Sequence, residues 1–402
     1  MNRMRVPAVV AGTVAAGTVA LVALTAFTVV ARHQHDPAPR PSRPAAPGLV
    51  SRLDTSQLAG QRVIYSYRGL TPPPALLRLI RRGEAAGVIF FAGNIASPRQ
   101  LATVARELQQ ANLSPANPVH LPLLLMADQE GGLVRRLPGP PVLSEKQIGQ
   151  SARPAARARQ AGTGAAANLR AAGLNVNLAP VLDVYRSAGD FLDQYGRSYS
   201  LDPRLVAQLG ADFITAQQAG GVAATAKHFP GLGAAARPQD TDLRPVTLTV
   251  PRAALRGVDE VPYRAAIAAG VKLVMLSWAV YPALDPARPA GLSPAIVQGE
   301  LRHRLGFRGV TITDALGAGA LARFGGIGHR GRLAALAGMD LLLCSNHSVA
   351  EGEQALAGLA AGYRSGQLSR ASARAAVAQI IALRQSLVRP GPGSGTRSRP
   401  PR

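Results

Sequence analysis

The chain has 402 residues, of which 47% are hydrophobic and 17% are charged, and its formal net charge is +23. This length and hydrophobic content exclude an intrinsically disordered chain and allow one large domain or two ordinary ones. The single cysteine, Cys344, excludes an intramolecular disulfide and a cysteine-based zinc cluster; at the end of the apolar run MDLLLC it is expected to be buried.

The positive charge does not indicate a nucleic-acid partner. Arginines are scattered along the chain, and aromatic residues make up only 4%, so the sequence has neither a basic stripe nor many side chains for stacking on bases. The charge agrees better with a general attraction to an anionic surface such as a cell envelope. An arginine-rich coding bias with no partner explains it equally well.

The first 32 residues are predicted to be a targeting segment. Residues 6–31 form an uncharged, mostly apolar run that follows Arg3 and Arg5 and ends at Arg32. Such a run is longer than the usual apolar core of a signal peptide and long enough to span a bilayer. We therefore predict a signal-anchor over residues 1–32, with a cleaved secretion signal as the alternative. Both place the rest of the protein outside the cytoplasm, either membrane-anchored or secreted.

Proline-rich segments flank the part of the chain that is predicted to fold. Residues 33–49 are rich in proline and predict a stiff spacer, so we assign a linker to residues 33–54. The tail, residues 389–402, has the composition of a disordered segment. The folded domain is therefore expected to cover residues 55–388.

Within that domain, short apolar runs alternate with amphipathic helical patterns. The runs predicted to be strands are 62–67, 87–91, 121–127, 174–182, 221–226, 271–277, 309–313 and 339–344. Helices are predicted between them, among others over 74–86, 98–112, 155–172, 203–219, 253–269 and 294–305. Near-continuous apolar strands separated by helices indicate a parallel sheet that is covered on both faces. The predicted fold class is α/β, a single (β/α)₈ TIM-type barrel, with a doubly wound open sheet as the alternative.

Polar residues follow several of the predicted strands. Catalytic residues of such barrels lie where the strands end, at the carboxyl face. The residues at these positions are Asp128, Asp183, Lys227 with His228, Ser277 with Trp278, and Asp314. Lys227 is one of only three lysines in the chain, which favours a functional role. A lysine at the end of a strand is as often a solvated surface charge as a functional group. Carboxylates with cationic donors, without a cluster of metal ligands, suggest cleavage of a glycosidic bond.

Six motifs carry a resemblance to a known family. They are DQEGGLVRRLPG (128–139), NLAPVLDV (177–184), GRSYSLDP (196–203), KHFPGLG (227–233), VMLSWAVYPALD (274–285) and GFRGVTITDALGAGAL (306–321). In this order they resemble glycoside hydrolase family three, and within it the single-domain β-N-acetylhexosaminidase branch. The resemblance covers roughly residues 55–385. It implies a barrel fold, a carbohydrate substrate, and no cofactor or metal.

The resemblance also implies roles for individual residues. Asp314, in the motif ITDAL, resembles the nucleophile that forms a glycosyl-enzyme with retention of configuration. The positions that resemble sugar ligands of the family are Asp128, Arg136, Arg197, Lys227 and His228.

One part of the family pattern is missing. The branch has KHFPGHG followed by DSH, whose histidine is the general acid/base, whereas this chain has Leu232 and then Asp240-Thr241-Asp242. Asp242 stands in the place of that histidine and is our choice for the acid, with Asp240 second. We expect the loop over residues 233–244 to fold over the pocket and to present only one of these acids, because alternate residues of an extended segment face opposite ways.

The sequence therefore predicts a monomeric glycosidase that removes terminal β-linked (N-acetyl)hexosamine residues from cell-wall-type glycans. The alternative is a non-catalytic glycan-binding barrel of the envelope, because the usual acid/base histidine is absent. A G-x-G-x-x-G sequence at residues 326–331 does not directly follow a predicted strand, and its next acid, Asp340, comes too early for a dinucleotide-binding fingerprint.

Overall fold

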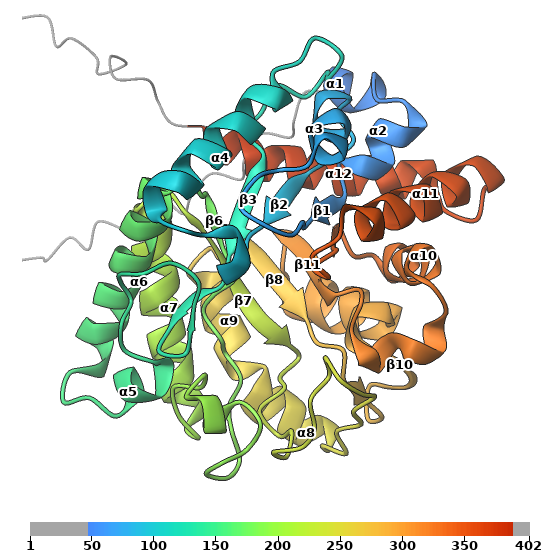
Figure 1. Ribbon diagram of the computed structural model, residues 1–402. Helices are drawn as coiled ribbons and strands as arrows, with labels where there is room; N and C mark the ends of the chain where they lie inside the picture. The colour runs from blue at the N-terminus through green and yellow to red at the C-terminus, as the bar shows by residue number, and fades with distance from the viewer. Residues whose placement is uncertain (1–46, 389–402) are drawn as a thin grey trace, which may run out of the picture. The chain divides into compact units, whose positions relative to one another are not determined.

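The computed structural model describes residues 47–388, and its centre is a barrel of parallel strands (Figure 1). The eight strands close in the order β1-β12-β11-β8-β7-β6-β3-β2, so each pairs with its neighbours in the chain and the last returns to the first. This closure confirms the single (β/α)₈ barrel and rules out the open sheet. The strands are β1 (Val63–Tyr65), β2 (Gly87–Ile89), β3 (Leu124–Ala127), β6 (Val176–Asn177), β7 (Ala223–Phe229), β8 (Leu273–Leu276), β11 (Val310–Ala315) and β12 (Leu341–Leu343).

Helices surround the barrel and occupy the segments between strands (Figure 1). The α-helices are α1 (Pro47–Ser51), α2 (Thr55–Gly60), α3 (Pro74–Arg81), α4 (Pro98–Asn112), α5 (Glu145–Gly149), α6 (Pro154–Ala171), α7 (Pro203–Ala219), α8 (Arg252–Ala254), α9 (Val261–Ala268), α10 (Ile327–Ala337), α11 (Val349–Ser365) and α12 (Arg370–Ser386). Two of them, α4 and α7, begin where a capping side chain precedes a proline; in α4, Ser97 accepts the Gln100 N–H and Pro98 follows it.

Shorter elements complete the description. Two predicted helices contain wide π-helical turns, η3 (Leu255–Asp259) and η5 (Ala295–Arg304). The 3₁₀ turns are η1 (Ala92–Asn94), η2 (Asp193–Tyr195), η4 (Ala290–Leu292) and η6 (Gly319–Phe324). Two small hairpins follow barrel strands and consist of β4 (Gln129–Gly131) with β5 (Val134–Arg135), and β9 (Val280–Tyr281) with β10 (Asp285–Pro289).

The strands differ in length from the apolar runs that predicted them. β6 keeps only two residues of the run 174–182, because Pro180 has no N–H for a ladder and the segment after β6 pairs irregularly with β7. β7 instead extends beyond the predicted 221–226, so Lys227 and His228 lie within the strand and not after it.

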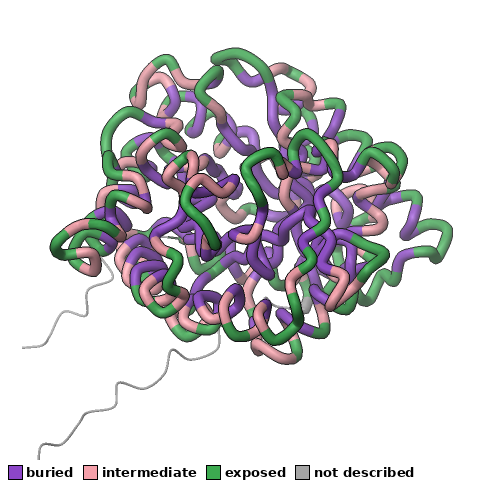
Figure 2. The backbone as a smooth tube through the Cα atoms, turned by 90° about the horizontal axis from the view of Figure 1, so that it is seen from below, coloured by how far each residue is buried: buried purple, intermediate pink, exposed green. Residues whose placement is uncertain are grey.

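Buried residues gather inside the barrel and between the barrel and its helices (Figure 2). Cys344 is among them, as expected. The apolar cluster within the barrel also includes Ile380 and Leu383 of α12, which therefore covers the amino-terminal ends of the strands. Arg384 of α12 is fully buried there and donates to the carbonyl oxygens of Leu121 and Pro122, just before β3. The amino-terminal end of the barrel interior is thus closed by α12.

The ends of the chain lie largely outside the described residues. The predicted targeting segment (1–32), most of the predicted linker and the tail (389–402) are not described. The last part of the predicted linker belongs to the folded body, because α1 lies within it and Val50 and Leu53 are buried against the core. Across residues 47–388, no helix has the length and apolar character that crossing a membrane requires.

Candidate active site

A cavity of about 190 Å³ opens at the carboxyl ends of the barrel strands. It brings together every residue that the family resemblance and the choice of acid assign to catalysis or sugar binding, whereas Asp183, Ser277 and Trp278 of the strand ends do not line it. Those residues are Asp128, Arg136, Arg197, Lys227, His228, Asp240, Asp242 and Asp314. Apolar side chains, including Phe91, Phe191 and Met275, form other parts of the wall. A polar pocket with a few apolar walls fits a sugar, which has hydroxyls at its edge and C–H groups on its faces.

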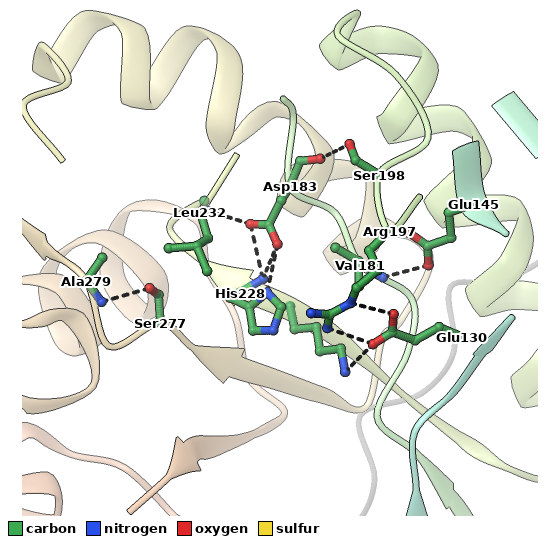
Figure 3. A network of polar contacts seen from close by, with 12 residues as sticks. Glu130, Glu145, Val181, Asp183, Arg197, Ser198, His228, Leu232, Ser277 and Ala279 are labelled. Atoms are coloured by element: carbon green, nitrogen blue, oxygen red, sulfur yellow. Dashed lines mark hydrogen bonds and ion pairs between the residues drawn. The ribbon is translucent and has the colours of Figure 1, made fainter. Parts of the chain in front are cut away.

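The floor of the cavity holds a network of ion pairs, which we call the charged floor: Asp128, Glu130, Arg197 and Lys227. The Lys227 ammonium lies 2.8 Å from Asp128 and 2.7 Å from Glu130, and its side chain is only 2% exposed. Arg197 donates to both oxygens of Glu130 at 2.9 Å (Figure 3). The two carboxylates are therefore held ionised by two cations in a nearly dry environment.

The charges of the floor shift one another's ionisation. Burial alone would raise the pKa of Asp128, but Lys227 and Arg136 outweigh it and lower this pKa to about 2. Burial alone would also raise the pKa of Glu130. Arg197 and Lys227 outweigh this effect, so the Glu130 pKa is lowered. The Lys227 pKa is raised by these two acids despite burial. The floor therefore keeps its charges throughout the physiological pH range.

Arg136 differs from the other cations of the cavity. Its guanidinium is 3.6 Å from Asp128, beyond hydrogen-bond distance, and it lies over the Phe91 ring with 6.0 Å to the ring centroid. Its Nε is buried and has no hydrogen-bond partner among the residues that the structure describes. Arg136 thus has side-chain donors left to offer to a ligand, whereas Arg197 and Lys227 each already direct two contacts to the carboxylates of the floor.

Asp183 fixes the orientation of His228 on the neighbouring wall (Figure 3). The fully buried Asp183 carboxylate lies 2.7 Å from His228 Nδ1 and accepts the backbone N–H groups of His228 and Leu232. A carboxylate that accepts from Nδ1 leaves Nε2 as the ring nitrogen available to the cavity. Asp183 stands among the strand-end acids in the sequence, but no role is predicted for it there.

Glu130 and Glu145 are buried acids of the site that the sequence did not single out. Glu145, in α5, accepts the Val181 N–H at 2.9 Å, and burial together with the nearby Glu130 raises its pKa well above the usual range. Glu145 is therefore the protonated acid of the pair, and Glu130 the ionised one. The sequence could have revealed Glu130 through its place in DQEGG, two residues after Asp128, but Glu145 follows no strand.

The loop over residues 233–244, which we call the acid loop, contributes both Asp240 and Asp242 to the cavity wall. The segment forms turns and is not extended, so the alternation expected of an extended segment does not apply to these two acids. Asp240 Oδ1 accepts the Asp242 N–H at 2.8 Å, and the Asp240 carbonyl accepts the N–H groups of Leu243 and Arg244. Asp240 thus stabilises the turn that presents Asp242.

Asp242 has the ionisation behaviour of a proton donor. Asp242 as a whole residue is exposed and lines the cavity, yet the surrounding protein partly desolvates its carboxyl group. This desolvation, together with the nearby charges of Asp314 and Asp240, raises the Asp242 pKa to about 6. Between residues 47 and 388, no hydrogen bond or ion pair reaches its carboxyl oxygens, so the group remains free to meet a ligand.

Asp314 lies in β11, half-buried, at the place where the ladder to β12 becomes irregular. One of its carboxyl oxygens accepts the N–H of Ala315 at 2.8 Å, and the Ala315 carbonyl accepts from the indole of Trp278, also at 2.8 Å. The first of these bonds orients the Asp314 carboxylate, which lines the cavity together with Asp242 of the acid loop.

Other readings of the sequence find no support in this geometry. The glycines of residues 326–331 begin α10 after a 3₁₀ turn and do not follow a strand, so they lack the context of a dinucleotide site. Within residues 47–388, no group of three or more histidine, cysteine or acidic side chains is arranged to hold a metal ion.

Comparison with known families decides the identity of the fold. The sequence model of the family described as "Glycosyl hydrolase family 3 N terminal domain" matches residues 66–383. The chain belongs to glycosyl hydrolase family 3. The resemblance seen in the six motifs is thereby confirmed, and the protein is a glycoside hydrolase by family.

Curated members of family 3 align with most of the chain. A protein of Arthroderma benhamiae named as a secreted glycosyl hydrolase is 46% identical over 85% of this chain and 96% of its own length. A beta-hexosaminidase of Stenotrophomonas maltophilia is 35% identical over 69% of this chain and 82% of its own length.

Solved structures of family 3 share the fold. A β-N-acetylglucosaminidase from a Paenibacillus species superposes with a TM-score of 0.78 at 36% identity, over 83% of this chain and 63% of that one. The β-N-acetylhexosaminidase of Beutenbergia cavernae gives a TM-score of 0.73 at 30% identity, over 83% of this chain and 97% of that one. Within family 3, these relatives place the chain among the β-N-acetylglucosaminidase-like glycosidases.

Proposed function

We propose that this protein removes terminal β-linked N-acetylhexosamine residues from glycans of the cell-wall type by a retaining, two-step reaction. The proposal rests most on one observation: a single cavity contains the half-buried Asp314, the proton-carrying Asp242 and a set of charged hydrogen-bonding groups. The names of the similar hexosaminidases and acetylglucosaminidases supply the sugar.

In the first step, the Asp314 carboxylate attacks the anomeric carbon while Asp242 donates its proton to the leaving oxygen. A carboxyl pKa of about 6 leaves Asp242 largely protonated in mildly acidic solution. In the second step, the ionised Asp242 takes a proton from water, which attacks the anomeric carbon and releases Asp314. The sugar leaves with the configuration it had in the substrate.

The remaining polar groups hold the sugar during both steps. Asp128 is an ionised acceptor for hydroxyl groups, and Lys227 and Arg197 keep it and Glu130 in place. Arg136 donates from its unpaired guanidinium nitrogens, and His228 presents Nε2. Because the charged floor is rigid and closed below, it suits the end of a glycan chain better than its middle.

We also propose that the protein acts outside the cytoplasm. The secreted relative from Arthroderma benhamiae and the apolar run over residues 6–31 support this location, and the run leaves both anchoring and release open. A monomer is the expected form.

Turnover of a chromogenic aryl β-N-acetylglucosaminide by the purified protein tests the proposal, with Asp314→Asn as the matched variant. Asn keeps the size and a hydrogen-bond acceptor, so the fold should persist while turnover falls by roughly 10⁴-fold or more. NMR of the first-formed product should show the β-anomer. A protein that binds N-acetylglucosamine without turning over any such substrate would instead be the glycan-binding barrel, for which the missing histidine is the argument.

A further inference from the structure

The acid loop is joined to the segment that follows the nucleophile strand by two backbone hydrogen bonds. The Gly319 N–H donates to the Asp242 carbonyl at 2.7 Å, and the Ala320 N–H donates to the Thr241 carbonyl at 3.1 Å. Thr241 is buried between the two segments at 4% exposure. The peptide groups on both sides of Asp242 Cα are therefore fixed relative to Gly319 and Ala320.

Only glycine allows this approach at position 319. A Cβ atom built on Gly319 would lie 2.2 Å from the carbonyl oxygen of Leu243 and 2.4 Å from its carbonyl carbon. These are backbone atoms, which cannot rotate away as the end of a flexible side chain can. Any side chain at position 319 must therefore push the two segments apart at Asp242.

The segment that carries Gly319 is itself firmly attached to the Asp314 strand. The Leu316 N–H donates to Leu343 of β12 at 2.9 Å, and its carbonyl accepts from the Arg330 guanidinium at 2.8 Å. Ala318 and Ala320 are buried in the core on either side of Gly319. A short, well-packed path of backbone thus connects the nucleophile to the backbone of Asp242.

The acid loop is also attached at its beginning. The Phe191 N–H donates to the Ala235 carbonyl at 2.9 Å, and a Cβ on Gly233 would lie 2.1 Å from the Val184 carbonyl oxygen. The loop is therefore held at both ends, and Asp242 lies next to the second of the two attachments.

From this geometry we infer that Gly319 is a positioning residue for Asp242: its N–H and its missing side chain set the distance between the proton donor and Asp314. This inference rests on the proposed function, in which Asp242 is the acid. Misplacing a catalytic group by about 1 Å can cost on the order of 10²-fold in rate. Gly319→Ala should therefore impair the steps that need Asp242 and no others.

The test is a double-mutant cycle on two substrates. The variants are Gly319→Ala, Asp242→Asn and both together, with Gly326→Ala as the control, because Gly326 has open space around its Cβ position and no positive φ. Values of kcat/KM are measured for the disaccharide of N-acetylglucosamine, whose leaving group needs a proton, and for an activated aryl N-acetylglucosaminide, which needs little. kcat/KM is used because it reports the first bond cleavage even when release of the second product is slow.

Gly319→Ala should lower kcat/KM for the disaccharide by about tenfold or more and change that for the aryl substrate by less than about threefold. In the Asp242→Asn background it should have almost no further effect, since the group that it positions is gone. An equal additional loss in that background, or no selective loss in the single variant, overturns the positioning role. If Asp242→Asn itself shows no preference for the aryl substrate, the acid assignment fails and the inference fails with it.

Hydrogen exchange on the unmodified protein tests the same contact without a variant that must fold. The peptide over residues 317–322 should exchange its Gly319 and Ala320 amides as slowly as core amides of the neighbouring strands. Exchange of both amides at the rate of exposed loops would show that the attachment does not persist, and would overturn the inference.

Discussion

On the charged floor, Asp128 and Glu130 each contact a buried cation at 2.9 Å or less, whereas the Asp242 carboxyl in the acid loop faces the cavity mouth without such a partner. The same chemical group consequently has its pKa lowered to about 2 on the floor, at Asp128, and raised to about 6 in the loop, at Asp242. The floor contains fixed charges that can orient a ligand, and the loop contains a proton that can move.

The comparison also bears on the missing histidine. The family branch places an imidazole in the acid loop, and this chain places a carboxyl group there. An unperturbed aspartate would be ionised at neutral pH and could not donate a proton. Desolvation and the charge of Asp314 raise the Asp242 pKa to about 6, so a protonated fraction persists closer to neutral pH, without any change to the floor. The two regions are thus separable, and the predictions below test that separation.

The largest effect is expected from removing the cation at the centre of the floor. Lys227→Met leaves Asp128 and Glu130 close together, with Lys227 no longer between them. Breaking a buried ion pair in this way typically costs about 3–5 kcal/mol of unfolding free energy, and sugar binding should be lost as well. Denaturant unfolding and turnover of the aryl substrate measure the two effects.

Lys272→Met is the matched control, because Lys272 is exposed and forms no ion pair within residues 47–388. It should change stability by less than about 0.5 kcal/mol. A Lys227→Met protein as stable as this control would mean that the floor does not depend on its buried cation.

The next largest effect separates the two acids of the loop. Asp242→Asn removes the proposed proton donor and should lower kcat/KM for the disaccharide by about 10²–10⁴-fold. Asp240→Asn keeps the side-chain oxygen that accepts the Asp242 N–H, so it should stay within about threefold of the parent protein. The reverse order of losses would assign the acid to Asp240 and make Asp242 the structural residue.

The sequence predicted the fold and the charged floor more completely than it predicted the acid loop. The eight apolar runs each gave one barrel strand, since burial on both faces of a parallel sheet leaves a continuous apolar signature. Asp128, Lys227 and Asp314 could be placed in one cavity because strand ends converge at one face of a barrel.

The missed residues depend on contacts between segments far apart in the sequence. Glu145 lies in a short helix that no strand position marks, and its burial against Val181 follows only from the packed structure. The turn at Asp240 is attached to Gly319, whose role is invisible until the two segments meet. Pro238 gave a local sign of a turn, but the prediction treated the segment as extended.

A smaller effect is expected where the floor and the wall meet, at Asp183. Its two oxygens accept three N–H groups: the backbone of His228, the His228 ring and the backbone of Leu232. Asp183→Asn places an NH₂ group against one of these donors, which leaves a buried N–H unpaired at a cost of about 1–3 kcal/mol. The loss of His228 orientation should also raise KM more than it lowers kcat.

Asp202→Asn is the control for Asp183, because Asp202 caps α7 and asparagine caps a helix equally well. Urea unfolding and steady-state kinetics compare the two variants. If Asp183→Asn were as stable as Asp202→Asn and had an unchanged KM, the three-donor account of Asp183 would be wrong.

The smallest expected effect is a change of kcat/KM with pH, which distinguishes the carboxylates of the charged floor from the carboxyl group of the acid loop. Asp242 must be protonated to act as the acid, and its pKa is raised to about 6, so kcat/KM for the disaccharide should fall about tenfold per pH unit above that value. The Asp128 pKa of about 2 keeps that floor carboxylate out of this range.

Asp259 is the competing candidate for the titrating group, because burial raises its pKa to about 7 despite its ion pair with Arg186. Asp259→Asn should leave the falling limb in place, whereas Asp242→Asn should remove it. A limb that disappears with Asp259→Asn would assign the titrating proton to the Asp259–Arg186 pair and not to the acid loop.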